Sequence, residues 1–331
     1  MGFGDFDVLC QKAALPLCPL VGPPNAFTGQ RGIQPLCYSR SISLANTIIF
    51  QGAAAFAHIM ALIMTIIMII HVRSKFTAVG RKEITTFFYL YFLLSAFSLV
   101  LDAGVVPLGS AAYPYFVAAQ SGLASATAVS LLISGMVGFQ LYEDGTKLSV
   151  WLLRTCALVM FIITFAVNIF TFKGIAGLGP TKTIGLFVVL YIATAIFVFV
   201  YIVMQFLLVF GTLTERWPAG HLAFCVFFFV AGQVILYVFA DSVCEGVQHY
   251  MDGLLFATVC NLLAVMMVYK YWDSITREDL EFSVGQRTNN WEVKELMQDN
   301  DHTNTDYQDS DYAASMYQPR HRTSVGGSTG Y

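Results

Sequence analysis

The chain has 331 residues, of which 56% are hydrophobic and 12% are charged, with a formal net charge of −3. Soluble domains carry about 25% charged residues, so this composition excludes an ordinary soluble protein and indicates a polytopic membrane protein. A basic footprint for nucleic acid is absent, so we expect no nucleic-acid partner.

Residues 1–45 are predicted to form an N-terminal arm that differs from a secretory signal peptide. A signal peptide has a basic start followed by an unbroken apolar stretch. Here four prolines interrupt that stretch, and the first membrane helix is expected to act as an uncleaved signal anchor. The prolines are Pro16, Pro19, Pro23 and Pro24.

Seven long apolar runs follow, and almost no charged residue lies inside any of them. An α-helix needs about 20 apolar residues to cross the core of a lipid bilayer. The sequence therefore predicts an all-α membrane domain over 46–272, built as a bundle of seven transmembrane helices. The predicted spans are 46–71, 84–106, 114–141, 149–172, 183–211, 221–241 and 253–272.

The distribution of basic residues predicts the orientation of the bundle. Cytosolic loops of membrane proteins are enriched in Lys and Arg. Residues 103–113 and 242–252 contain neither, whereas the loop between Lys173 and Lys182 is a mild exception. We expect a lumenal N-terminus and a cytosolic C-terminus. The loop assigned most firmly to the cytosol contains Arg73, Lys75, Arg81 and Lys82.

Ionisable residues inside a membrane usually mark an ion path. Asp102, Arg154, Asp241 and Lys270 all fall near the ends of the predicted helices, where they can reach the interface. The spans are therefore predicted to serve packing rather than ion transport. Six other polar residues are expected to form interhelical hydrogen bonds, each of about 0.6 kcal/mol. They are Gln51, His58, Asn168, Gln205, Gln233 and Asn261.

The third span carries a small residue at every fourth position. Small residues let helix backbones approach closely in lipid. Four residues turn a helix by about 400°, so the stripe drifts around the axis and can meet two neighbours. We expect the third helix to be central, with docking of a partner's helix as the alternative. The stripe comprises Ala118, Gly122, Ala126, Ser130, Ser134 and Gly138.

Aromatic residues crowd the fifth and sixth spans, with Phe197, Phe199 and Tyr201 in one and Phe227 to Phe229 in the other. Small residues are few in these two spans. Such side chains suit a wall that faces either lipid or a partner, and both alternatives stay open.

Four of the seven cysteines fall on the predicted lumenal side, while Cys156, Cys225 and Cys260 lie within helices. Disulfides are favoured in an oxidising compartment. Four cysteines allow three pairings, and we expect at least one disulfide, with free thiols in a mobile arm as the alternative. The candidates are Cys10, Cys18, Cys37 and Cys244.

One group of residues could carry chemistry. Asp241, Glu245, His249 and Asp252 are spaced by four, four and three, which would put them on one face of a helix. Carboxylates with an imidazole can hold a divalent metal, so a lumenal metal-dependent hydrolase is an alternative function. A solvated loop face is the favoured interpretation. Since catalytic motifs and a phosphate loop are missing, we expect no enzyme activity, catalytic residues, metal or cofactor.

A seven-helix receptor is the other alternative. The third span ends in Gln140-Leu-Tyr-Glu-Asp144 rather than in an Asp/Glu-Arg-Tyr pattern, and Asn261 is not followed by proline. No mid-helix lysine in the seventh span could bind retinal. Other receptor classes remain open.

Residues 273–331 form a predicted cytosolic tail with eleven acidic and five basic residues. Its polar composition predicts disorder after about residue 288. Asp279 and Glu281 form an acidic triplet with the residue between them, of the type that vesicle coat adaptors read in cargo. They are a candidate export signal, with a solvated helix end as the alternative.

Several long stretches resemble the fungal chitin synthase export chaperones. The resemblance runs from the N-terminus to about Gly285 and touches nearly every segment. It rests on Gly4-Asp-Phe6 with Cys10, Leu15-Pro-Leu-Cys18, Leu44–Gly52, His71–Glu83, Phe139–Gly145, Gly185–Tyr191, Gln248–Gly253 and Tyr269–Ile275.

This resemblance implies a multi-pass protein of the endoplasmic reticulum membrane that a chitin synthase needs to leave that compartment. Members of the family are chaperones or cargo escorts, not enzymes. The implied partner is a chitin synthase, bound through its transmembrane helices. Whether the pair stays together on its way to the cell surface is left open.

Overall fold

The structure is a computed structural model that describes residues 4–23, 32–44, 47–76, 78–139, 145–175, 177–212 and 216–285. The chain divides into two compact units, Met1–Asp279 and Leu280–Tyr331. Within the second unit, the described residues are the last six of a helix that ends at Gly285.

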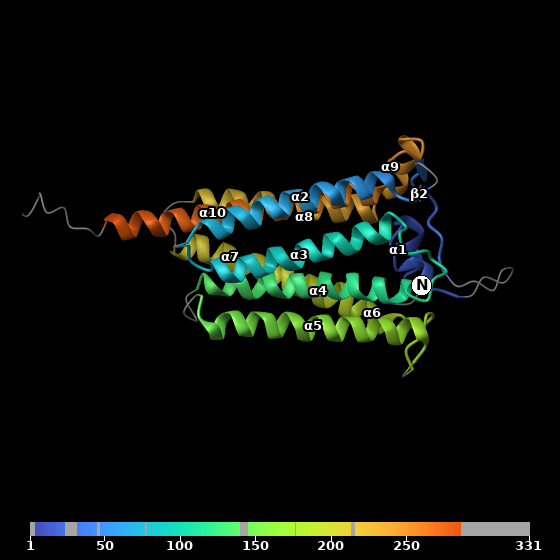
Figure 1. Ribbon diagram of the computed structural model, residues 1–331, viewed down its shortest axis with the longest axis horizontal. Coiled ribbons are helices and arrows are strands. Elements are labelled where there is room, and N and C mark those ends of the chain that lie inside the picture. Colours follow the sequence, from blue (N-terminus) through green and yellow to red (C-terminus); the bar gives the residue numbers. More distant parts are fainter. Residues whose placement is uncertain are drawn as a thin grey trace, which may run out of the picture. The chain divides into compact units, whose positions relative to one another are not determined.

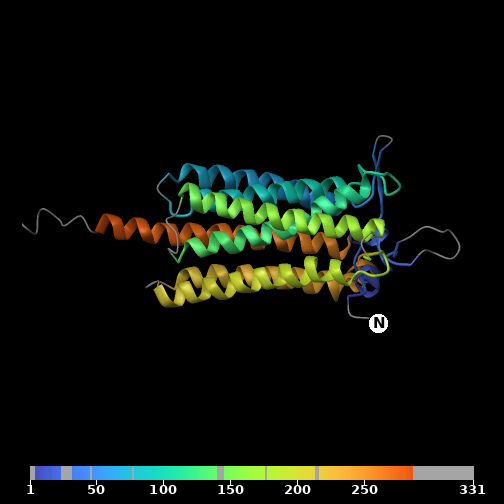
Figure 2. The same ribbon diagram turned by 90° about the horizontal axis from the view of Figure 1, so that it is seen from below.

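Seven helices within the described residues are long and apolar enough to cross a membrane, which confirms the predicted seven-helix bundle. Both views show them running side by side (Figures 1 and 2). The fifth span combines α6 (Ile184–Phe187), a π-helical turn (Val188–Ala193) and α7 (Thr194–Thr212). The other six are α2 (Gly52–Ser74), α3 (Arg81–Asp102), α4 (Tyr113–Val137), α5 (Lys147–Lys173), α8 (Trp217–Tyr237) and α10 (Gly253–Gly285).

Helix α10 continues to Gly285, beyond the predicted end at residue 272, and the first span begins at Gly52 instead of residue 46. Strands β1 (Ile42–Leu44) and β2 (Thr47–Ile49) pair as an antiparallel hairpin just before it. Isoleucines are as apolar in a strand as in a helix, so hydropathy alone did not separate the two. The sixth span begins earlier than predicted because Pro218 occupies the first turn of α8, a position that proline favours.

Four short elements, α1 (Asp7–Lys12), a 3₁₀ turn (Cys18–Leu20), the hairpin and α9 (Ala240–Gly246), complete the described structure. Figures 1 and 2 show the N-terminal segment, the hairpin and α9 gathered at one end of the bundle, which we call the capped end.

Helix α4 is the most enclosed of the seven. In its most apolar stretch 61% of the residues are buried, compared with 17% in α5 and 11% in the α6–α7 span. It contacts α3, α5 and α7. On the other side of the bundle α10 contributes Val268 to a buried cluster that also includes Val72 of α2, Phe88 of α3 and Cys225 of α8. The bundle therefore has two well-packed sides and a more open one along α5 and α7.

Candidate functional site

Residues 4–23 fold into the capped end of the bundle, and we call them the N-terminal cap. Their apolar side chains are buried together with residues from four long spans. Apolar burial of this kind stabilises the fold by about 25 cal/mol per Å². The cap contributes Phe6, Cys10, Leu17, Cys18 and Val21, and the spans contribute Leu101, Tyr113, Val117, Ala118, Phe172 and Leu186.

Hydrogen bonds hold the backbone of the cap in place. The hydroxyl of Tyr113, on α4, donates to the carbonyl oxygen of Pro16 over 2.7 Å. The hydroxyl of Thr183 donates to the carbonyl oxygen of Gly4 over 2.8 Å. A buried carbonyl group without a partner costs free energy. These bonds therefore allow the irregular cap segment to be buried between the helix ends.

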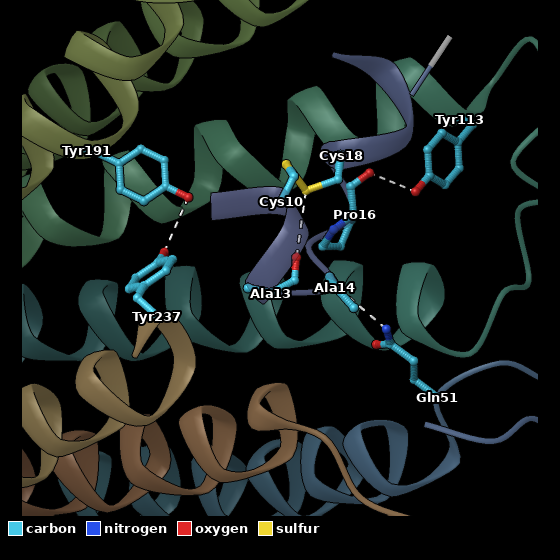
Figure 3. Close-up of a disulfide and its surroundings, with 9 residues drawn as sticks. All are labelled: Cys10, Ala13, Ala14, Pro16, Cys18, Gln51, Tyr113, Tyr191 and Tyr237. Carbon is cyan, nitrogen blue, oxygen red and sulfur yellow. Dashed lines mark hydrogen bonds between the residues drawn. A yellow bond between two sulfur atoms is a disulfide. The ribbon is translucent and has the colours of Figure 1, made fainter. Parts of the chain in front are cut away.

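The four candidate cysteines form two disulfides in the structure. Cys10 is bonded to Cys18 within the cap (Figure 3). Cys37 is bonded to Cys244 and so ties the segment before β1 to α9, across 207 residues of sequence. Of the three pairings open to the sequence, the structure selects this one. The lumenal location of these cysteines stays a prediction.

The predicted helical face of metal ligands is wrong. Helix α9 contains Asp241 and Glu245 but ends at Gly246. His249 follows in a left-handed conformation with φ 66°, and Asp252 immediately precedes α10. The four residues therefore do not share a helix face. Among the described residues, the one group with metal-ligand spacing instead joins His249 to Cys37 and Cys244.

Asp252 has a structural role at the start of α10. Its carboxylate accepts a hydrogen bond from the backbone N–H of Leu255 over 3.2 Å and one from the hydroxyl of Ser39 over 3.4 Å. This is the arrangement of a helix N-cap. Burial raises the pKa of Asp252, while the Leu255 N–H bond lowers it and the nearby charge of Asp102 raises it further.

Asp102 is buried rather than in contact with the interface. It is the last residue of α3, and its Oδ2 lies 3.0 Å from Nε2 of His58 on α2. The two side chains are 3% and 11% exposed. The other ring nitrogen of His58 is buried and has no partner within the described residues. The pair therefore joins α2 to α3 close to the capped end.

Gln205 and Asn168, two of the polar residues predicted to bond between helices, differ in their partners. The amide of Gln205 on α7 donates to the carbonyl oxygen of Gly135 on α4 over 3.0 Å and accepts from the hydroxyl of Tyr271 on α10 over 2.8 Å. It therefore links three helices. Asn168, in contrast, donates to the carbonyl of Thr164 on its own helix, so the predicted interhelical bond is wrong for this nitrogen.

The stripe of small residues faces two neighbouring helices. A Cβ added at Gly122 would lie 2.9 Å from the ring of Phe161 on α5, and one added at Gly138 would lie 2.8 Å from Leu208 on α7. Ala118, Ala126 and Ser130 are buried, Ser134 is half-buried, and Gly138 is exposed at the end of α4. Close helix approach therefore occurs on both sides of α4.

A second set of contacts lies at the opposite end of the bundle. Glu83 is fully buried, and its Oε1 accepts from the hydroxyl of Ser149 over 2.8 Å and from the N–H of Gly145 over 3.0 Å. Lys75 and Asp273 form an ion pair. These contacts tie the loops at this end to α5 and α10.

The outer sides of α5, α7 and α8 form an extensive apolar surface. A groove of ≈ 270 Å³ opens on it, lined by residues of α4, α5 and α7. Its lining residues are Val129, Thr155, Cys156, Val159, Met160 and Phe197. The exposed apolar residues on these helices include Trp151, Ile162, Phe199, Leu207, Phe210 and Phe227.

Asp279 and Glu281 both lie on α10, which continues to Gly285. Their side chains, and the tail after Gly285, lie outside the part of the chain that the structure describes. The triplet is therefore a helical segment here, not an extended one.

Sequence reasoning missed two features, the burial of Glu83 and the pairing of His58 with Asp102. Both acidic residues stand at an end of an apolar run, where an interfacial side chain is the ordinary expectation. The one sequence signal for the pair was an unusual histidine inside the first span, without any indication of its partner.

Comparison with known proteins identifies the family. The family model for the chitin synthase export chaperone matches residues 2–286. No solved structure matches the chain. A protein of Aspergillus oryzae named chitin synthase export chaperone is 64% identical over 98% of both chains.

Two further relatives carry the same name. The protein of Emericella nidulans is 63% identical over 100% of both chains. That of Phaeosphaeria nodorum is 65% identical over 97% of this chain and 96% of its own. With a family match over most of its length and three full-length relatives, the chain belongs to the chitin synthase export chaperone family.

Proposed function

We propose that this protein is a membrane chaperone through which a chitin synthase is exported from the endoplasmic reticulum. The observation that carries the proposal is the 63% identity to a chitin synthase export chaperone along the full length of both chains. The seven apolar helices fit a protein that meets its client within the bilayer.

The proposed mechanism is binding without catalysis. The bundle would contact transmembrane helices of the synthase and cover their polar or poorly packed faces until an export-competent complex forms. In lipid such contacts depend on close packing and hydrogen bonds rather than on the hydrophobic effect. The outer apolar surface of α5 and α7 is the least covered part of the bundle and is our candidate contact face.

A deletion experiment tests the export function. The gene is removed in its fungal host, and a fluorescent chitin synthase is followed together with an unrelated plasma-membrane protein. We expect the synthase to stay in the endoplasmic reticulum while the unrelated protein reaches the surface, and the full chain to restore export. Normal delivery of the synthase would disprove the proposed function.

Site-specific photo-crosslinking tests the contact face. A photoreactive residue at Phe199, exposed on α7, is compared with one at Ile70, exposed on α2. We expect adducts with the synthase from Phe199 and none from Ile70. The reverse pattern would move the contact face to the other side of the bundle and leave the export function untouched.

We further propose that Asp279 and Glu281 load the complex into coated vesicles through a cargo adaptor. The substitutions Asp279→Ala and Glu281→Ala should slow export and leave co-purification of the synthase intact. Glu278→Ala, in the same helix but outside the triplet, is the matched control. Because the triplet is helical, an adaptor that reads extended peptides would have to bind after local unwinding. Unchanged export would refute this role.

The proposed orientation places residues 1–45 in the lumen, 46–272 in the membrane and 273–331 in the cytosol. In sealed microsomes, added protease should remove an epitope tag at the C-terminus and spare one at the N-terminus. The opposite result would invert the topology and place both disulfides in the cytosol.

A further inference from the structure

His249 lies directly beside the Cys37–Cys244 disulfide. Its Nδ1 is 3.1 Å from Sγ of Cys37 and 3.8 Å from Sγ of Cys244. The two cysteines are buried and the histidine is exposed. The Cys37–Cys244 disulfide therefore has an imidazole beside it. Among the described residues, Cys10 and Cys18 belong to no such group.

The backbone holds this imidazole over the sulfurs. His249 has φ 66° and the preceding Gln248 has φ 52°, a left-handed conformation that costs energy for residues other than glycine. The N–H of His249 donates to the carbonyl oxygen of Cys244 over 3.0 Å. Its own carbonyl oxygen accepts from the N–H of Arg40 over 2.8 Å. The turn is therefore tied both to α9 and to the segment that carries Cys37.

Nδ1 of His249 lies at the spacing of a zinc site from each of the two sulfurs. All three atoms lie within 4.8 Å of one another. Tetrahedral zinc binds thiolate sulfur at about 2.3 Å and imidazole nitrogen at about 2.0 Å, which puts sulfur and nitrogen roughly 3.5 Å apart. The two distances in the structure lie on either side of this value. Only the two sulfurs, joined by their bond, would have to separate.

We propose that Cys37, Cys244 and His249 form a redox-dependent site for a thiophilic divalent cation, of which zinc is the physiological candidate. In the oxidised protein the sulfurs form the disulfide and the site is closed to metal. In the reduced protein two thiolates and Nδ1 of the neutral imidazole bind the ion. Water fills the fourth position, and the exposed side of His249 gives the ion access.

A dithiol is the reductant that opens the Cys37–Cys244 disulfide. The dithiol delivers two electrons and two protons, which break the Cys37–Cys244 bond and yield two thiols, and it becomes a disulfide itself. Binding of the zinc ion then releases the two thiol protons. Either state ties the segment before β1 to α9, so the ion would preserve this connection when the disulfide is open.

Cobalt(II) serves as the spectroscopic probe for this site. The full-length protein in detergent is reduced with a phosphine, freed of reductant and titrated anaerobically with cobalt. We expect thiolate-to-cobalt charge-transfer bands and the visible absorption of tetrahedral cobalt, with one ion bound per chain. Added zinc should abolish both signals, and the unreduced protein should show neither.

The decisive variant is His249→Ala, which leaves both disulfides able to form. Loss of the imidazole ligand should weaken cobalt binding by at least about tenfold. Changes to the groups around a metal ligand already reduce metal affinity by this amount or more. The double substitution Cys10→Ser with Cys18→Ser is the matched control and should bind as the original protein does. All variants keep the three helix cysteines, so background binding to those thiols cancels in the comparison.

Two results would overturn the proposal. One is the absence of a cobalt-thiolate spectrum in the reduced original protein. The other is a spectrum of equal strength in the His249→Ala variant, because the cysteines would then bind the ion without the imidazole. A spectrum that requires His249 and survives the control substitutions supports it.

Discussion

Nε2 of His58 on α2 and Oδ2 of Asp102 at the end of α3 lie 3.0 Å apart and are nearly inaccessible. The histidine stands in the second turn of α2, and the aspartate closes the next helix. Two polar groups that would each be costly in an apolar bundle thereby satisfy one another, since an ionic group is tolerated there only with a partner.

Removal of either partner of this pair should be strongly destabilising. His58→Ala leaves the carboxylate of Asp102 buried without its hydrogen-bond partner, and a buried polar group left unsatisfied costs about 1–3 kcal/mol, more when it is charged. We expect a clear fall in the melting temperature measured by size-exclusion chromatography of heated samples. His71→Ala, which removes an exposed imidazole from the same helix, should change it little.

Replacement of both partners by leucine should restore most of that loss, because apolar groups of similar shape can replace both members of a buried hydrogen-bonded pair at little cost. If the double leucine variant is as unstable as His58→Ala, the pair contributes more to stability than the mutual satisfaction of its two polar groups.

The stability contributed by Asp252 should depend on pH. Burial raises its pKa in the folded protein, so its charge weakens the fold at neutral pH. This penalty disappears below the unfolded pKa of about 3.9, where the group is protonated in both states. Asp252→Asn retains an oxygen that can accept from Leu255 and removes the buried charge.

We therefore expect Asp252→Asn to raise the melting temperature at neutral pH, by an amount that shrinks as the pH falls. Glu245→Gln, at an exposed carboxylate of α9, is the control and should show no such trend. A variant that melts lower than the original protein at every pH would mean that the carboxylate is needed by its partners.

The close approach of α4 and α5 depends on Gly122. Gly122→Ala would place its Cβ 2.9 Å from the ring of Phe161 and 3.1 Å from that residue's carbonyl oxygen. Overpacking of this kind costs about 1–3 kcal/mol. Gly220→Ala in α8 should be neutral or slightly stabilising, because no described atom beyond the local helix backbone lies within 4 Å of the added Cβ. If Gly122→Ala and Gly220→Ala change the melting temperature equally, α4 does not pack tightly at Gly122.

Attachment of the N-terminal cap depends in part on Tyr113. Tyr113→Phe removes the donor to the carbonyl oxygen of Pro16, a loss of about 0.5–1.5 kcal/mol. Hydrogen–deuterium exchange should accelerate in residues 4–23 and stay unchanged in the helix centres. Tyr115→Phe is the control, since the exposed hydroxyl of Tyr115 accepts from Lys173 outside the cap. Exchange in the cap that is equally fast in both variants would contradict this attachment.

The number and positions of the membrane helices could be predicted from the sequence. Crossing a bilayer is a requirement on the length and polarity of one continuous segment, so each span is visible locally. The central position of α4 was similarly suggested by its small residues, because their spacing determines how closely neighbours can come. The start of the first span shifted because the local pattern at Ile48 and Ile49 is ambiguous between strand and helix.

Tertiary structure alone decided which distant groups meet. The pairing of Cys37 with Cys244, the burial of Asp102 against His58, and the position of His249 beside the sulfurs all join segments remote in sequence. Helix α9 likewise ends at Gly246, so the four-residue spacing of its carboxylates does not extend to His249 on the same helix. A periodic pattern fixes what one segment prefers, whereas the partner of a side chain depends on how all the segments pack together.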